Sequence, residues 1–126
     1  MKKLVLLFAC MITIQAFTQD TAKKNAYLGV LTLTEKYKDE KNWAAGEQAI
    51  VGEHFQRLIK KKDEGIVVLA GRTELPLNDA NMMGLVIFYA KDDKEALQFM
   101  MDDPAVKNKI MQTKVHPYGL AISKCQ

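Results

Sequence analysis

Two short apolar runs constrain the fold of this chain more than any other feature of the sequence. They are IVVLA at residues 66–70 and GLVIFYA at residues 84–90. Each run has the length of a β-strand, and the segments around the runs contain glycine and other loop-forming residues. A strand with one face in water alternates apolar and polar residues, whereas these two runs do not. We therefore expect two neighbouring strands whose side chains are apolar on both faces of a sheet.

Helical and strand patterns flank these two runs. Residues 43–63 have helical spacing, and Gly65 is well placed to end that helix. One side of this helix is apolar and carries Ile50, Val51, Phe55, Leu58 and Ile59. A second helix is predicted at 92–102, with inward-facing Ala96, Leu97, Met100 and Met101. Strands at 26–34 and 114–123 complete the order β-α-β-β-α-β.

This order is the split βαβ, or ferredoxin-like, pattern of an α+β domain. Two helices then cover one face of a four-stranded antiparallel sheet. The second face is also apolar in the two central runs of the sequence, so something must cover it. A second copy of the same sheet would do so and give an isologous homodimer. A bound apolar ligand or a thick loop is the alternative.

The first 18 residues have the features of a cleavable signal peptide. Lys2 and Lys3 precede an almost wholly apolar stretch at 4–14, and small residues before Gln19 favour cleavage there. A buried N-terminal helix or strand is the alternative, and so is a lipoprotein anchored through Cys10. The signal peptide predicts a secreted or periplasmic protein that has no membrane contact once the signal is removed.

Charge and cysteine content narrow the function of the mature chain. The formal net charge is +3, and two of these charges belong to lysines of the signal, so no cationic surplus remains for nucleic acid. After cleavage, residues 19–25 form a loose polar segment and residues 26–124 form one domain. Cys125 is then the one remaining cysteine, which excludes an internal disulfide and leaves an intermolecular one as its alternative role.

Five short motifs occur in the order and spacing of one family. They are EHFQRL at 53–58, LAGRT at 69–73, GLVIF at 84–88, DDPAVK at 102–107 and HPY at 116–118. Together they resemble the YCII-related (YciI-like) proteins, and the resemblance runs from Tyr27 to Ile122. It implies a dimeric α+β barrel of ferredoxin-like subunits. It also implies a pocket centred on a histidine and an aspartate, which the motifs map to His54 and Asp103.

The resemblance also indicates a type of chemistry. One branch of the family is linked to removal of chloride from chlorinated hydroxyquinols, and related barrels isomerise lactones or oxidise small aromatics. A signal peptide departs from the usual cytoplasmic setting of such proteins.

His54 and Asp103, the proposed catalytic pair, could each have a purely structural role as an alternative to a chemical one. His54 borders the apolar side of the 43–63 helix, where it is either a proton carrier near neutral pH or a hydrogen-bonded residue at the edge of the core. Asp103 precedes Pro104, which is the arrangement of a helix N-cap. The same carboxylate would orient the His54 imidazole. Asp102 is the alternative partner of His54.

Three further residues are candidates for substrate binding. Arg72 follows a strand and would hold a carboxylate or phenolate, or else form a salt bridge with Glu74. Trp43 would form a wall of the pocket or anchor the core. His116, in the last strand, is a second proton carrier or an exposed strand residue. We expect no metal site, because the two histidines have no cluster of Cys, Asp or Glu around them.

These observations favour an exported small-molecule enzyme. His54 would transfer protons on a small aromatic or enolic substrate, with Asp103 orienting it, in lyase, isomerase or dehydrochlorinase chemistry. No cofactor is expected, because the sequence has neither a phosphate-binding glycine loop nor a dinucleotide fingerprint. The alternatives are a dimer of the same fold that binds a small ligand without chemistry, and an interaction protein whose apolar sheet face binds another chain.

Overall fold

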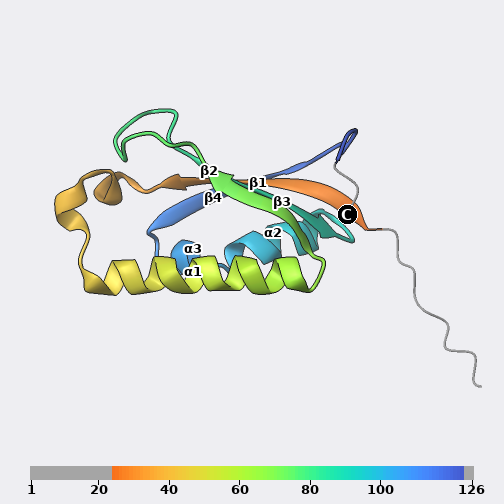
Figure 1. Cartoon of the computed structure of the whole chain (residues 1–126), viewed down its shortest axis with the longest axis horizontal. Coiled ribbons are helices and arrows are strands. Elements are labelled where there is room, and N and C mark those ends of the chain that lie inside the picture. Colours follow the sequence, from red (N-terminus) through yellow and green to blue (C-terminus); the bar gives the residue numbers. More distant parts are fainter. Residues whose placement is uncertain (1–23, 124–126) are drawn as a thin grey trace, which may run out of the picture.

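The computed structural model describes residues 24–123, which form one antiparallel sheet with helices on one of its faces (Figure 1). The predicted signal peptide at 1–18, with Cys10, lies outside the described residues. So do Cys125 and nearly all of the predicted loose segment at 19–25.

The order of elements agrees with the predicted β-α-β-β-α-β pattern. The strands are β1 (Asn25–Leu33), β2 (Val67–Arg72), β3 (Gly84–Ala90) and β4 (Met111–Pro117). The helices are α1 (Ala45–Asp63), α2 (Asp93–Met101) and the short α3 (Pro104–Lys107). Two turns of 3-10 helix, η1 (Glu35–Lys38) and η2 (Glu40–Asn42), lie between β1 and α1. The sheet order is β2-β3-β1-β4 with every pair antiparallel, so the predicted α+β ferredoxin-like fold is confirmed.

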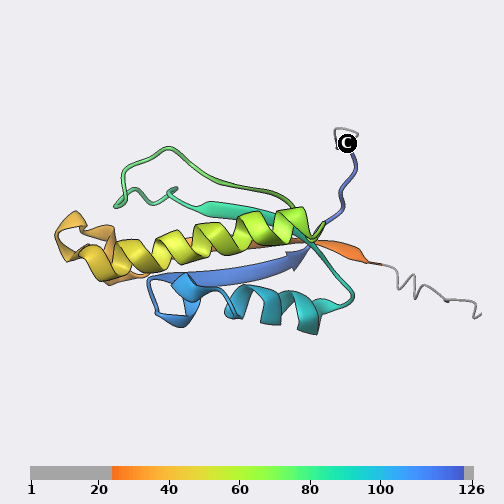
Figure 2. The same ribbon diagram turned by 60° about the horizontal axis from the view of Figure 1, so that its bottom comes forward.

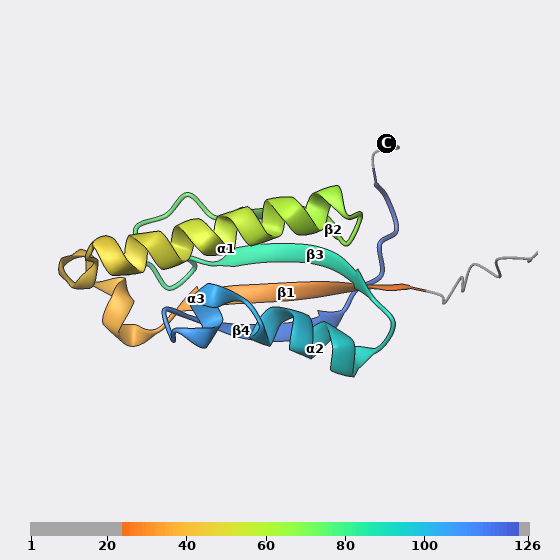
Figure 3. The same ribbon diagram turned by 90° about the horizontal axis from the view of Figure 1, so that it is seen from below.

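The helices form a single layer beneath the sheet. Figures 2 and 3 show α1 along the side of β2, and α2 and α3 along the side of β4. The chain reverses direction between α1 and β2 at Gly65, whose φ of 75° is a conformation that glycine adopts without strain. This reversal lays β2 antiparallel to α1.

The core lies between the sheet and the helical layer. Alternate residues of the two central strands are buried there, including Tyr27 and Leu31 of β1 and Val86 and Phe88 of β3. Met100 of α2 packs against them. A Cβ at Gly29 would lie 2.6 Å from the Met100 Cε atom, so a larger residue there would force the Met100 side chain to move.

The opposite face of the sheet is apolar across three strands. Paired residues of neighbouring strands point to the same face, so the row Leu69–Ile87–Leu28 crosses β2, β3 and β1 on the side away from the helices. Leu85 and Val30 form a second pair in this position. Within residues 24–123 no helix covers this face (Figure 1). The predicted pairing of two such sheets stays a prediction.

Two residues expected in the core lie on the surface. Leu97 and Met101 of α2 are 50% and 47% exposed, whereas Ala96 and Met100 are buried. Successive helical residues are rotated by about 100°, so in this helix the pair at i and i+4 reaches the sheet and the next pair does not.

The last strand also differs from the predicted 114–123. It begins at Met111, which pairs with Leu33, and it ends at Pro117. Met111 and Val115 pack against the core, which draws the start of the strand earlier. Pro117 has no N–H group, so the regular ladder ends there.

Candidate active site

A cavity of about 630 Å³ lies between α1 and the side of the sheet formed by β2, β3 and β1. Its walls are mainly apolar, with Val51, Phe55 and Leu58 on the side of α1. The volume is within the range of about 300–1,000 Å³ that is usual for small-molecule sites. Phe55, expected on the buried side of α1, is 60% exposed because it borders this open cavity rather than the packed core.

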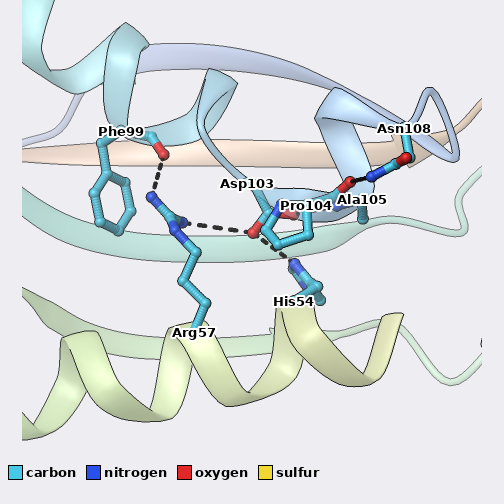
Figure 4. Close-up of polar contacts among 7 residues, drawn as sticks. All are labelled: His54, Arg57, Phe99, Asp103, Pro104, Ala105 and Asn108. Carbon is cyan, nitrogen blue, oxygen red and sulfur yellow. Dashed lines mark hydrogen bonds and ion pairs between the residues drawn. The ribbon is translucent and has the colours of Figure 1, made fainter. Parts of the chain in front are cut away.

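His54 lies in the wall of this cavity and is bonded on its other side to Asp103. Its Nδ1 atom lies 2.8 Å from the Asp103 Oδ2 atom, and its side chain is 12% exposed (Figure 4). An ionised carboxylate accepts hydrogen bonds and donates none, so next to an ionised Asp103 the donor in this pair is Nδ1. In the neutral imidazole, Nε2 then has a free lone pair that can accept a proton from a bound molecule.

Asp103 is held from several directions, and its side chain is 1% exposed. It is the N-cap of α3: its Oδ1 atom accepts the Ala105 N–H at 2.9 Å, and Pro104 is the first residue of the helix. Its Oδ2 atom accepts from His54. The two roles read from the sequence therefore coexist on one carboxylate, with one oxygen for each.

Arg57 completes this network and was not among the residues predicted for the site. Its Nη1 atom lies 3.5 Å from Asp103 Oδ2, and its Nη2 atom donates to the Phe99 carbonyl at 2.7 Å (Figure 4). Its guanidinium carbon lies 4.4 Å from the centre of the Phe99 ring. The signal for Arg57 was its spacing of three residues from His54, which puts both side chains on one face of α1.

Arg72 and Trp43 line the same cavity as His54. The side chain of Arg72 forms no ion pair with any described residue, so the alternative of a salt bridge to Glu74 is not realised. Trp43 donates its Nε1 hydrogen to the Tyr37 carbonyl at 2.8 Å, and its ring packs against that of Tyr37. Trp43 therefore packs against a second core cluster, formed by Leu33, Tyr37 and Ile110, and is also a wall of the cavity.

The structure does not bring the other two candidates to this site. His116 pairs with Leu28 on the sheet face away from the helices and does not line the cavity. Asp102 is at the surface, where its carboxylate accepts from the Gln98 amide at 2.8 Å. The carboxylate next to His54 is that of Asp103.

Over residues 24–123, no group of three or more His, Cys, Asp or Glu side chains is arranged to hold a metal ion. In the same part of the chain, no helix has the length and apolar character needed to cross a membrane.

Comparison with known proteins identifies the domain. A model of the YCII-related domain matches residues 30–117, a range that includes the end of β1 from Val30, all of α1 to β4, and both residues of the His54–Asp103 pair. No curated protein matches the chain. Because the match covers more than half of the sequence, the chain belongs to the YCII-related domain family.

Proposed function

We propose that this protein is an exported enzyme that transfers a proton on a small aromatic or enolic substrate without a cofactor. The observation that carries the proposal is the 2.8 Å contact between His54 Nδ1 and Asp103 Oδ2, with His54 in the wall of an apolar cavity. A histidine oriented by a buried carboxylate is a recurrent arrangement for general acid–base catalysis.

The proposed reaction begins at His54 Nε2. This atom takes a proton from a carbon of the substrate, and Asp103 stabilises the imidazolium that forms. Return of the proton to another carbon gives isomerisation. Departure of a leaving group such as chloride, with formation of a double bond, gives dehydrochlorination or another lyase reaction. Arg57 fixes the Asp103 carboxylate during these steps, and Arg72 and Trp43 hold the substrate.

The exported location is supported by the sequence of the first 18 residues, which has the basic start and apolar stretch of a signal peptide. Mass spectrometry of protein expressed with its own leader in a host with an export pathway would test this part. We expect a mature chain that begins at Gln19, and an uncleaved chain in the cytoplasm would contradict it.

The catalytic role is tested by replacing His54. The protein is offered chlorinated hydroxyquinols and unsaturated lactones, with chloride release and ultraviolet absorbance as readouts. For a substrate that is turned over, we expect His54→Ala to lower kcat by about a hundredfold or more, because the proton carrier is lost. The matched control is Gln56→Ala, an exposed position on the same helix that does not line the cavity. Full activity of His54→Ala would end the catalytic role.

A dimer that binds a small ligand without chemistry is the second candidate. The observation that favours it is the lining of the cavity, which is mainly apolar with few polar side chains. Such a protein needs no proton carrier, so His54→Gln would leave its ligand affinity largely intact while it would abolish enzymatic turnover.

A further inference from the structure

The cavity beside His54 has two permanent cations in its walls and no carboxylate. The cations are Arg72, the last residue of β2, and Lys62, in the last turn of α1. The remaining lining is apolar apart from His54, Thr32 and glycine backbone. Cationic side chains above an apolar surface favour a ligand that is itself apolar and negatively charged.

The two cations lie at opposite ends of the cavity. Lys62 is in the last turn of α1, next to the turn that leads into β2, whereas Arg72 is the last residue of β2 and lies far from that turn. At about 3.3 Å per strand residue, Arg72 is about 17 Å from Val67 at the start of β2. Counted back from Lys62 at about 1.5 Å per residue, α1 covers the same distance of about 17 Å near Val51. Arg72 is therefore at the His54 end of the cavity.

The two cations differ in their ion-pair partners. Lys62 forms an ion pair with Asp63 at 3.1 Å, whereas the guanidinium of Arg72 has no ion-pair partner among residues 24–123. Arg72 pairs with Gly84, which pairs with the buried Leu31, so all three face the helices. Gly84 has no side chain and leaves the floor of the cavity open beside Arg72.

We propose that the cavity binds an elongated apolar monoanion, such as an aryl carboxylate. Its anionic group lies on Arg72 next to His54, and its apolar body extends past Leu58 and Ile59 towards Val67. The inference rests on the function proposed above, for which it names the substrate class. A single unpaired cation at one end selects one negative charge, and the apolar body removes the surrounding walls from water.

The test uses two fluorescent dyes with the same aromatic body. Anilinonaphthalene sulfonate is an anion, and phenylnaphthylamine is its uncharged counterpart. We expect the wild-type protein to bind the anion more tightly. Arg72→Gln should weaken binding of the anion by about tenfold, the usual effect of losing one hydrogen bond to a charged group, and should leave the uncharged dye unaffected. Lys62→Gln should weaken binding of the anion less than Arg72→Gln does.

A second variant shows where the dyes bind. A Cβ at position 84 would come no closer than 3.5 Å to Leu31 Cβ, an ordinary contact, so the backbone accepts a side chain there. Gly84→Leu would fill the floor of the cavity, and we expect it to abolish binding of both dyes while thermal unfolding stays cooperative. Equal affinity for the two dyes, or binding unaffected by both Arg72→Gln and Gly84→Leu, would overturn the inference.

These measurements need no turnover and so separate the two proposals. Binding that depends on Arg72, with no His54-dependent reaction of any anionic substrate, would end the enzymatic proposal and keep the ligand class. Turnover of uncharged substrates that depends on His54, without Arg72-dependent binding, would keep the enzymatic proposal and end the proposed ligand class.

Discussion

The carboxylate of Asp103 joins a structural role to a proposed chemical one. Its Oδ1 atom caps α3, and its Oδ2 atom accepts from His54. The N-cap was predictable from the sequence, because an aspartate before a proline is a local pattern. The sequence did not decide whether Asp102 or Asp103 contacts His54. Asp102 is the C-cap of α2 and points to solvent, and one residue further the backbone turns the next carboxylate inward.

Replacing these two aspartates tests whether Asp103 is structurally important and Asp102 is not. We expect Asp103→Ala to lower the free energy of unfolding by roughly 3 kcal/mol, since it removes an N-cap and charge-assisted hydrogen bonds to His54 and Arg57. Asp103→Asn keeps an acceptor for the cap and should lose less. Asp102→Ala is the matched control and should change stability by no more than about 0.5 kcal/mol. Urea denaturation measures all three, and equal effects at the two positions would contradict the assignment.

Of the two ends of helix α1, the C-terminal end was predicted correctly from the sequence and the N-terminal end was not. Gly65 was predicted to end this helix and does so with a positive φ. The start was predicted at residue 43 but lies at Ala45, because the N-cap residue Ala44 has no side-chain acceptor to signal it. Glu47 takes over part of the cap: its Oε2 atom accepts the Ala44 N–H at 3.2 Å.

This substitute cap predicts a pH dependence of stability. Hydrogen bonds from its own backbone N–H and from that of Ala44 lower the pKa of Glu47, and the Tyr37 hydroxyl assists. A lowered folded-state pKa means that the carboxylate stabilises the protein above its unfolded-state pKa and loses this effect as the pH falls through the folded-state pKa.

We therefore expect Glu47→Gln to destabilise the protein at neutral pH. The difference in the free energy of unfolding between this variant and the wild type should shrink as the pH falls below the usual pKa range of a glutamate. Denaturation curves across the acid range measure it, with Glu53→Gln on the exposed side of α1 as the control. A difference that stays constant with pH would show that the Glu47 charge has no part in the cap.

For the whole molecule, the uncovered sheet face is the dominant feature. Leu69, Ile87 and Leu28 cross three strands in one row, and the face is polar at Thr32 of β1 and at β4, where His116 and Lys114 lie opposite β1 residues. In the single chain, Leu69 is 51% exposed and Ile87 is 8% exposed, and no described helix packs on this row. A second copy placed sheet against sheet would cover it, and we propose this arrangement for the protein in solution.

Sedimentation velocity of two charge variants tests the dimer. Val30 lies at the centre of the uncovered face, whereas Leu97 lies on the exposed side of α2. We expect wild type and Leu97→Glu to sediment as dimers and Val30→Glu to sediment as a monomer, because burying an unpaired charge between two sheets is costly. A wild-type protein that is monomeric at every concentration would refute the pairing of sheets.

The sequence by itself determined the elements, their order, the turn at Gly65, the cap at Asp103 and the two-sided apolar strands. Each of these depends on residues close together in the chain, whose spacing reveals a helical period or a strand. The tertiary structure alone decided which side chains meet. His54 and Asp103 are 49 residues apart, Arg57 joins them from α1, and Arg72 faces the cavity while His116 faces away from it. These outcomes depend on strand register and helix rotation, because a shift of one residue in a strand moves every side chain to the other face of the sheet.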